Sequence, residues 1–345
     1  MKIFFLSTLL VINSACATMP QTPNQLNGLD TFGSKRITTS VIEQQFGSQL
    51  NQFAKAEEGR DFDKSSLIKQ KIESSIKNQY QFAYVKISLI TYFQPNPGKY
   101  ITIDVVEPED VASRMAFLPE PKAKFDDPNG LIALWEEYLQ LGFELQRSGQ
   151  FEYPKTCHAW HCTHGFENSK LAPYLKKFNE LVPLSESKLV DILHKDTRPQ
   201  FRANAAFLLA HIKNGKALIR YLLPIVNDPA EVARNNVVRV LSEVAMKHPK
   251  LHIPVEPILK VLNFPATTDR NKASAVLEYL SLKEENKLII IRTAGKTLIE
   301  MLKLKQPNNH DPAYIILKNL SGNDFGKHDY QAWENWLNQE LSKDR

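Results

Sequence analysis

The densest group of side chains that could do chemistry is the run Cys157-His158-Ala159-Trp160-His161-Cys162-Thr163-His164. Two thiolates with one or two imidazoles are ligands that a tetrahedral zinc site uses. All of these side chains fall within eight residues, whereas structural zinc sites usually join two separated pairs of ligands. A disulfide between Cys157 and Cys162 would close a six-residue loop, and the sequence favours this disulfide over a metal site.

The sequence gives little support for a catalytic site elsewhere in the chain. Haem attachment needs a histidine directly after the second cysteine, where Thr163 stands. His310 and Asp311 are neighbours, but they lie at a predicted turn between helices, where Asn and Asp side chains typically cap a helix. The chain has no Gly-x-Ser-x-Gly, P-loop, Gly-x-Gly-x-x-Gly or His-Glu-x-x-His motif. We therefore expect no catalytic residue, metal or cofactor; the alternative is an enzyme or metal-binding protein that uses residues 157–164.

The elements around this run are predicted by the spacing of apolar residues. In the C-terminal half, four units each open with the pentad apolar-apolar-x-apolar-apolar, which marks one face of a helix. The pentads are residues 189–193, 222–226, 258–262 and 298–302.

A second helix is predicted after each pentad, anchored at Arg202, Arg234, Arg270 or His310. Apolar residues follow each anchor at positions +3, +6, +7 and +10, so each unit is a pair of amphipathic helices. Such pairs bury their stripes only by stacking, which predicts an α-solenoid. The sixteen positions are Ala205, Leu208, Leu209, Ile212, Val237, Val240, Leu241, Val244, Ala273, Val276, Leu277, Leu280, Ala313, Ile316, Leu317 and Leu320.

These units resemble HEAT repeats. The resemblance rests on Asp196…Arg202-x-x-Ala205 and on Asp228-Pro229…Arg234-Asn235-Asn236-Val237. It implies that the Asp and Arg side chains of neighbouring units form a ladder. The third unit carries its acid at Asp269, and the fourth has His310 in place of the arginine. The sequence therefore does not predict the ladder in those two units. Aromatic-rich helices at 168–182 and 324–341 are expected to cap the two ends of the stack.

The N-terminal part has a different pattern. The order strand, helix, helix, strand, strand resembles a POTRA domain, a small periplasmic module, and this resemblance implies that partners bind by adding a strand to a sheet edge. A further helix at 126–145 is expected to pack on a neighbouring domain. The expected elements are a strand at 35–41, helices at 46–56 and 63–77, and strands at 82–90 and 100–107 with a turn at 94–98.

The first seventeen residues are typical of a secretory signal peptide, with Lys2, an apolar run at 3–12 and the small-residue exit at 14–17. Cleavage after Ala17 is one route. Ser14-Ala15-Cys16 also resembles the end of a bacterial lipobox, in which Cys16 would be acylated, although Asn13 stands where Leu, Val or Ile is expected. No later stretch approaches the ~20 apolar residues of a membrane helix. We expect an exported, periplasmic protein. The alternative is an exported protein that is anchored to a membrane by a lipid on Cys16.

Composition sets the class of partner. Of 345 residues, 43% are hydrophobic, enough for a sizeable core, and a net charge of +5 is too small for a dedicated nucleic-acid binder. The face of the second helices opposite the buried stripe is predicted to form a binding groove, or to pack on the N-terminal domain. Its residues are Phe207, Arg239, Met246, Glu278, Ile315 and Lys318.

The expected protein is mainly α, and its function is non-catalytic. We expect a scaffold or adaptor of the bacterial cell envelope that captures a protein or peptide in the groove. The predicted division is a signal peptide at 1–17, a linker at 18–34, a small α+β domain at 35–108, a connecting helix with the Cys/His loop at 109–165 and HEAT-like repeats at 166–345.

Overall fold

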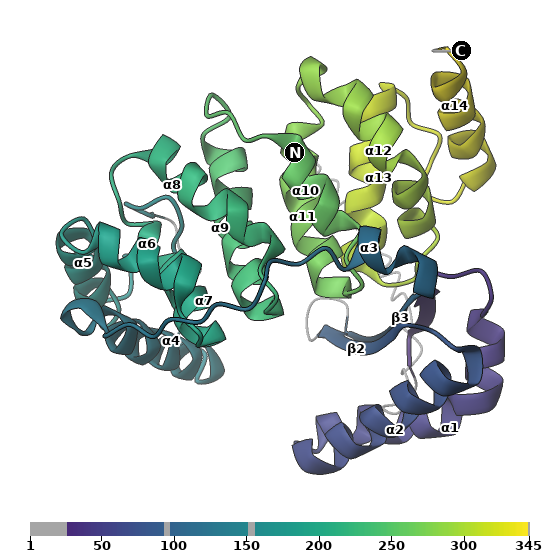
Figure 1. Cartoon of the computed structure of the whole chain (residues 1–345), viewed down its shortest axis with the longest axis horizontal. Helices are drawn as coiled ribbons and strands as arrows, with labels where there is room; N and C mark the ends of the chain where they lie inside the picture. The colour runs from purple at the N-terminus through teal and green to yellow at the C-terminus, as the bar shows by residue number, and fades with distance from the viewer. Residues whose placement is uncertain (1–25, 93–96, 151–155, 344–345) are drawn as a thin grey trace, which may run out of the picture.

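A computed structural model describes residues 26–92, 97–150 and 156–343. The signal peptide with Cys16 and most of the turn at 94–98 lie outside these residues. The fold is mainly helical (Figure 1). The described residues also form a three-stranded sheet. Among the helices described, none has the length and apolar character needed to cross a membrane.

The N-terminal domain pairs two helices with the sheet. Its strands are ordered β1-β3-β2, with β1 parallel and β2 antiparallel to β3. The predicted order strand, helix, helix, strand, strand is confirmed. The elements are β1 (Gly28–Phe32), α1 (Thr39–Glu58), α2 (Phe62–Tyr80), β2 (Tyr84–Tyr92) and β3 (Gly98–Val106).

The first strand was predicted in the wrong place. Residues 35–41 are not a strand; β1 lies upstream, inside the predicted linker at 18–34. Helix α1 begins at Thr39, because the Thr38 hydroxyl accepts a hydrogen bond from the backbone N–H of Val41 at 3.4 Å. The threonines that suggested a strand are therefore part of a helix start.

The two faces of the sheet serve different cores. Alternate side chains, including Ile87, Ile101 and Ile103, are buried with α1 and α2 in the N-terminal core. The opposite face turns toward the helical domain, where Phe32 joins that domain's core. The sheet thus couples the two domains by its strand alternation.

The C-terminal half forms four helix pairs, and all sixteen predicted stripe positions are at most 7% exposed. The second pentad is not one α-helix: α8 ends at Leu222 and a 3₁₀ turn follows, with Pro224 near its start. The pairs are α6 (Glu186–Lys195) with α7 (Pro199–Leu209), α8 (Gly215–Leu222) and η3 (Leu223–Asn227) with α9 (Glu231–Lys247), α10 (Val255–Leu262) with α11 (Thr267–Leu280), and α12 (Glu284–Leu302) with α13 (Pro307–Ser321).

Helices lie at both ends of this row, where the sequence predicted them. Helix α5 (Ala172–Leu181) precedes the first pair and buries Leu175 and Phe178. Helix α14 (Tyr330–Ser342) packs on α12 and buries Trp333 and Trp336.

A connecting segment runs along the turns of the helix pairs (Figure 1). Beyond η1 (Pro108–Asp110) and α3 (Val111–Arg114), residues 115–127 follow the turn edge back toward the first pair. Leu118 donates its N–H to the carbonyl of Asn227 at 2.8 Å, and Ala123 donates to Lys195 at 3.1 Å. After η2 (Pro128–Gly130), helix α4 (Leu131–Arg147) packs on α5 and α7, so the connecting helix belongs to the helical core.

Candidate functional site

The candidate site is the face of the second helices α7, α9, α11 and α13 that lies opposite their buried stripe, which we call the second-helix face. Three predicted residues are exposed there: Arg239, Met246 at 43% and Ile315 at 41%. Glu278 and Lys318 are half-buried. The predicted groove residues therefore fall into an open part on α9, α11 and α13 and a covered part on α7.

Phe207 corrects the groove prediction, because it is only 4% exposed. Its ring stacks on His161 with centroids 4.8 Å apart and on Trp135 of α4 at 5.3 Å. The chain's own Cys/His loop and α4 therefore cover the second-helix face at α7.

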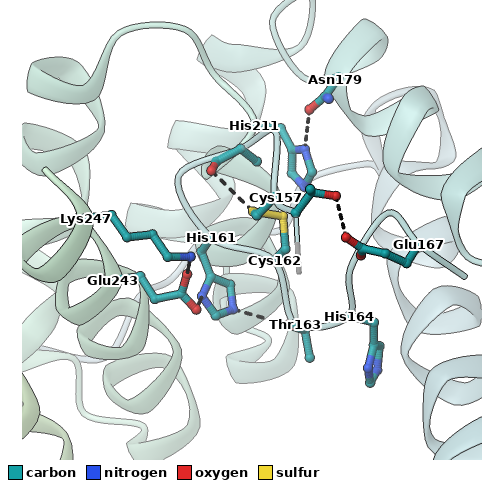
Figure 2. Close-up of a disulfide and its surroundings, with 12 residues drawn as sticks. Cys157, His161, Cys162, Thr163, His164, Glu167, Asn179, His211, Glu243 and Lys247 are labelled. Carbon is teal, nitrogen blue, oxygen red and sulfur yellow. Dashed lines mark hydrogen bonds and ion pairs between the residues drawn. A yellow bond between two sulfur atoms is a disulfide. The ribbon is translucent and has the colours of Figure 1, made fainter. Parts of the chain in front are cut away.

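The Cys/His loop is held by a disulfide between Cys157 and Cys162, the pairing that the sequence favoured over a metal site (Figure 2). Trp160 fixes the loop to the end of α7: its backbone N–H donates to Ala210 at 2.9 Å and its indole N–H to Ile212 at 2.7 Å. Gly215 leaves the room for this indole, since a Cβ there would lie 2.6 Å from the Trp160 ring. Both contacts make the loop a fixed part of the helical domain.

His161 reaches from the loop to α9. Its Nδ1 lies 2.7 Å from Glu243 Oε1, and its Nε2 lies 3.2 Å from the Thr163 hydroxyl. Figure 2 shows the ring directed at Glu243, which also pairs with Lys247. Burial tends to raise the pKa of Glu243, but His161 and Lys247 lower it overall.

A hydroxyl, an imidazole and a carboxylate in a row resemble a nucleophile with its base. The His161 side chain is only 3% exposed and lies flat on Phe207, so a substrate has no path to the imidazole. This arrangement instead clamps the loop to α9.

Two further histidines lie close to the loop and are buried. Burial, followed by the charge of His161, lowers the pKa of His211 to about 3. Burial lowers the pKa of His164 to about 4. His211 Nδ1 lies 2.6 Å from Asn179 Oδ1, which suits a neutral ring donating its N–H. Within the ranges that the structure describes, no three His, Cys, Asp or Glu side chains gather as a metal site.

Lys272 is a member of the second-helix face that sequence reasoning missed. Burial, together with the nearby charge of Arg239, lowers the pKa of Lys272 to about 8. The Lys272 ammonium donates to Asn271 Oδ1 at 3.1 Å, and neither cation forms an ion pair with any described residue. Lys272 lies at anchor +2, one helical turn before the +5 position, so the face pattern could have included it.

Lys318 is already engaged at the far end of the face. Its ammonium lies 2.6 Å from Asp324 Oδ2. This contact, together with the hydrogen bond that the Tyr314 hydroxyl donates to Asp324, lowers the pKa of Asp324 to about 2. Lys318 is thus less free to bind a partner than Arg239 or Lys272.

The ladder of arginines and aspartates lies on the opposite, turn edge of the pairs. Arg202 pairs with Asp228, and Arg234 with Asp269, each at 2.7 Å and fully or nearly buried. Asp269 therefore forms the ion pair of the ladder although it stands at a different position of its unit from Asp228. Arg270 pairs with Asp104 of β3 and approaches Asn309, so the N-terminal sheet supplies the next carboxylate.

The expected capping of α13 by Asn or Asp is wrong. The residue before this helix is Gln306, which makes no side-chain cap. His310 contacts the carbonyl of Leu302 at 2.5 Å. This contact closes the turn between α12 and α13.

No protein-family model matches the chain, and no curated protein matches it either.

Proposed function

We propose that this protein is a non-catalytic scaffold of the bacterial cell envelope, built as a HEAT-like α-solenoid behind a POTRA-like domain. Four stacked helix pairs with sixteen buried stripe positions support the solenoid interpretation. The disulfide supports an oxidising compartment, as expected for an exported protein.

The partner binds on the second-helix face of α9, α11 and α13. The observation that carries this proposal is the position of Arg239 on α9 and Lys272 on the adjoining α11, two cations of one face that form no ion pair with the described residues. After burial, the charge of Arg239 is the second cause that lowers the pKa of Lys272. Exposed Met246 and Ile315 supply apolar contact at the two ends of the same face. An extended segment that carries Asp or Glu between apolar side chains complements these groups.

The other surfaces are less suited to a partner. The turn edge is covered by residues 115–127 and by the N-terminal sheet. Strand addition at β2 is restricted, because Glu73 Oε1 already accepts the outward N–H of Ile87 at 2.7 Å. The second-helix face therefore remains the best place for binding.

The test uses two fluorescent peptides that differ only in having Glu or Gln at alternate positions between leucines. We expect the Glu peptide to bind more tightly, and Arg239→Glu with Lys272→Glu to weaken its binding roughly tenfold or more. Lys188→Glu on the exposed side of α6 is the matched control. Equal binding of the two peptides, or full binding by the double variant, would reject the proposed face.

Crosslinking then locates the partner in the cell. A photoreactive residue in place of Met246 or Ile315 should crosslink to a segment of the partner. An excess of the Glu peptide should abolish this crosslink, whereas the Gln peptide should leave it unchanged. The same residue in place of Leu184, which is 81% exposed between α5 and α6, is the control. A crosslink that neither peptide reduces would count against an acidic partner.

A further inference from the structure

A cavity of about 770 Å³ lies where the N-terminal domain meets the last helices. The loop after β1 and the end of β3 form one side, and the last turns of α12 with α14 form the other. Figure 1 shows α12 and α14 at the C-terminal end of the row of helices. This volume falls within the range of about 300–1,000 Å³ that small-molecule sites occupy.

Arg114 in the cavity wall lacks a carboxylate partner. Its side chain is 5% exposed, and it donates only to backbone carbonyls: Nε to Asn263 at 3.2 Å, and Nη1 to Val105 and Gly33 at 2.5 and 3.4 Å. Its Nη2 has no hydrogen-bond acceptor among the described residues. Asp104 and Asp110 lie near enough to attract this guanidinium, but neither forms an ion pair with it among the described residues. A buried guanidinium that donates only to neutral carbonyls is suited to receive an anion.

The chain backbone shapes the wall around this guanidinium. Gly33 has φ +102°, a conformation that side chains rarely adopt. A Cβ at this position would lie 2.3 Å from Arg114 Nη1 and 2.2 Å from the Val105 carbonyl oxygen. Glycine therefore lets the loop close against Arg114.

The other charges of the cavity limit what kind of anion fits. Four of its five acids already have partners: Glu107 pairs with Arg36, Glu300 and Glu334 pair with Lys303, and Asp30 accepts the backbone N–H groups of Lys305 and Gln306. The fifth is Asp110. The unpaired cations are Arg114, Lys35 and Lys296, which form no ion pair with the residues that the structure describes.

We propose that this cavity binds a small polar molecule with a single carboxylate, which Arg114 holds in the wall and Lys296 approaches from α12. A planar carboxylate matches the guanidinium. A doubly charged phosphate would meet stronger repulsion from the surrounding acids. Ser34, Thr39 and Asn338 line the same space and offer hydrogen bonds to the rest of the ligand.

Calorimetric titration of the full chain tests this with the dipeptide Ala-Ala and its C-terminal amide, which lacks the carboxylate. We expect the dipeptide to bind, and the amide and inorganic phosphate to bind at least about tenfold more weakly. Equal binding of dipeptide and amide, tighter binding of phosphate, or no binding of the dipeptide at millimolar concentration would overturn the proposal.

Variants then assign the residues. Arg114→Gln and Lys296→Gln should each weaken dipeptide binding, whereas Lys188→Gln on α6 should not. Because Arg114 also links the two domains through carbonyls, its variant could unfold. Lys296 is exposed and outside any described ion pair, so Lys296→Gln alone then decides: unchanged affinity would overturn the assignment. This site is distinct from the second-helix face, and the peptide tests there do not depend on it.

Discussion

Three buried arginines determine how neighbouring helix pairs meet. Each of these arginines lies at the start of a second helix and pairs with a buried carboxylate. Arg202 and Arg234 reach Asp228 and Asp269 of the following pair, whereas Arg270 reaches Asp104 of β3. The carboxylate of Asp228 also accepts the N–H of Ala230 at 2.7 Å, so the same side chain orders its own turn. Burial makes each pair sensitive to the loss of one partner, because the remaining charge has no water to replace it.

Asp228→Asn should lower the free energy of unfolding by about 3 kcal/mol, because it leaves Arg202 buried without its counter-charge. Chemical denaturation measures this loss. Asp191→Asn breaks an exposed pair with Lys195 and should cost at most about 0.5 kcal/mol. Equal losses of unfolding free energy in the two variants would show that the buried Arg202–Asp228 pair contributes no more to stability than a surface pair.

The buried histidines make stability depend on pH. For His211 the pKa is lowered to about 3 in the folded protein, so the unfolded chain binds a proton that the folded chain does not. Stability should therefore fall as the pH drops from about 6.5 toward 3, with a slope of about 1.4 kcal/mol per pH unit from this group.

Denaturation midpoints across this pH range measure the slope. His211→Gln should flatten it, whatever the change costs at neutral pH, whereas His252→Gln at an exposed position should not. The same slope in His211→Gln as in the unchanged protein would contradict the burial argument.

The covering loop packs closely between α4 on one side and α7 with α9 on the other. Helix α4 carries Gly142, where a Cβ would lie 2.1 Å from His164 Nε2, and Tyr138, whose hydroxyl donates to the His164 carbonyl at 2.6 Å. On the other side of the loop, Trp160 and His161 contact α7 and α9. The loop thus replaces a partner on the covered part of the second-helix face.

Gly142→Ala should destabilise the protein by about 1–3 kcal/mol, because the added methyl forces the His164 ring and the loop away from α4. Gly47 of α1 is the matched control: a Cβ there meets only the Glu43 side chain at 3.7 Å. Gly47→Ala should instead stabilise α1 by about 0.5–1 kcal/mol. Thermal or chemical denaturation distinguishes the two signs, and a stabilising Gly142→Ala would disprove the close contact.

The two domains are joined by buried polar contacts as well as by Phe32. Asp30 of β1 accepts the N–H groups of Lys305 and Gln306 at 2.9 and 3.1 Å, and Asp104 of β3 pairs with Arg270. The Tyr92 hydroxyl adds a contact to the N–H of Asn308 at 3.2 Å. These contacts lie at the turns of the third and fourth pairs, so the sheet continues the arginine ladder into another domain.

Asp30→Ala with Asp104→Ala should uncouple the domains. We expect a single calorimetric transition for the unchanged protein and two for the double variant, with a larger radius of gyration in X-ray scattering. Glu58→Gln, which removes a partner of Lys99 within the N-terminal domain, should keep one transition. One transition and an unchanged radius in the double variant would mean that apolar packing alone holds the domains together.

Much of the architecture follows from the sequence because it depends on local periodicity. The stripe at +3, +6, +7 and +10 follows from the geometry of a helix, and every such residue is buried. The cysteine pair is equally local, since its two residues are five positions apart. The strand at 35–41 was wrong because short runs rich in threonine suit both a strand and a helix start.

What covers a face, and which charges meet, depends on contacts between distant segments. Phe207 satisfies the groove pattern, yet the loop at 157–162 and α4 bury it. Arg270 finds Asp104 across 166 residues of sequence, and no spacing rule connects them. The cavity beside Arg114 likewise exists only where two domains meet. The sequence alone therefore determined the helix pairs and the disulfide, whereas tertiary packing decided the open binding face, because burial and pairing depend on the partner that folding brings close.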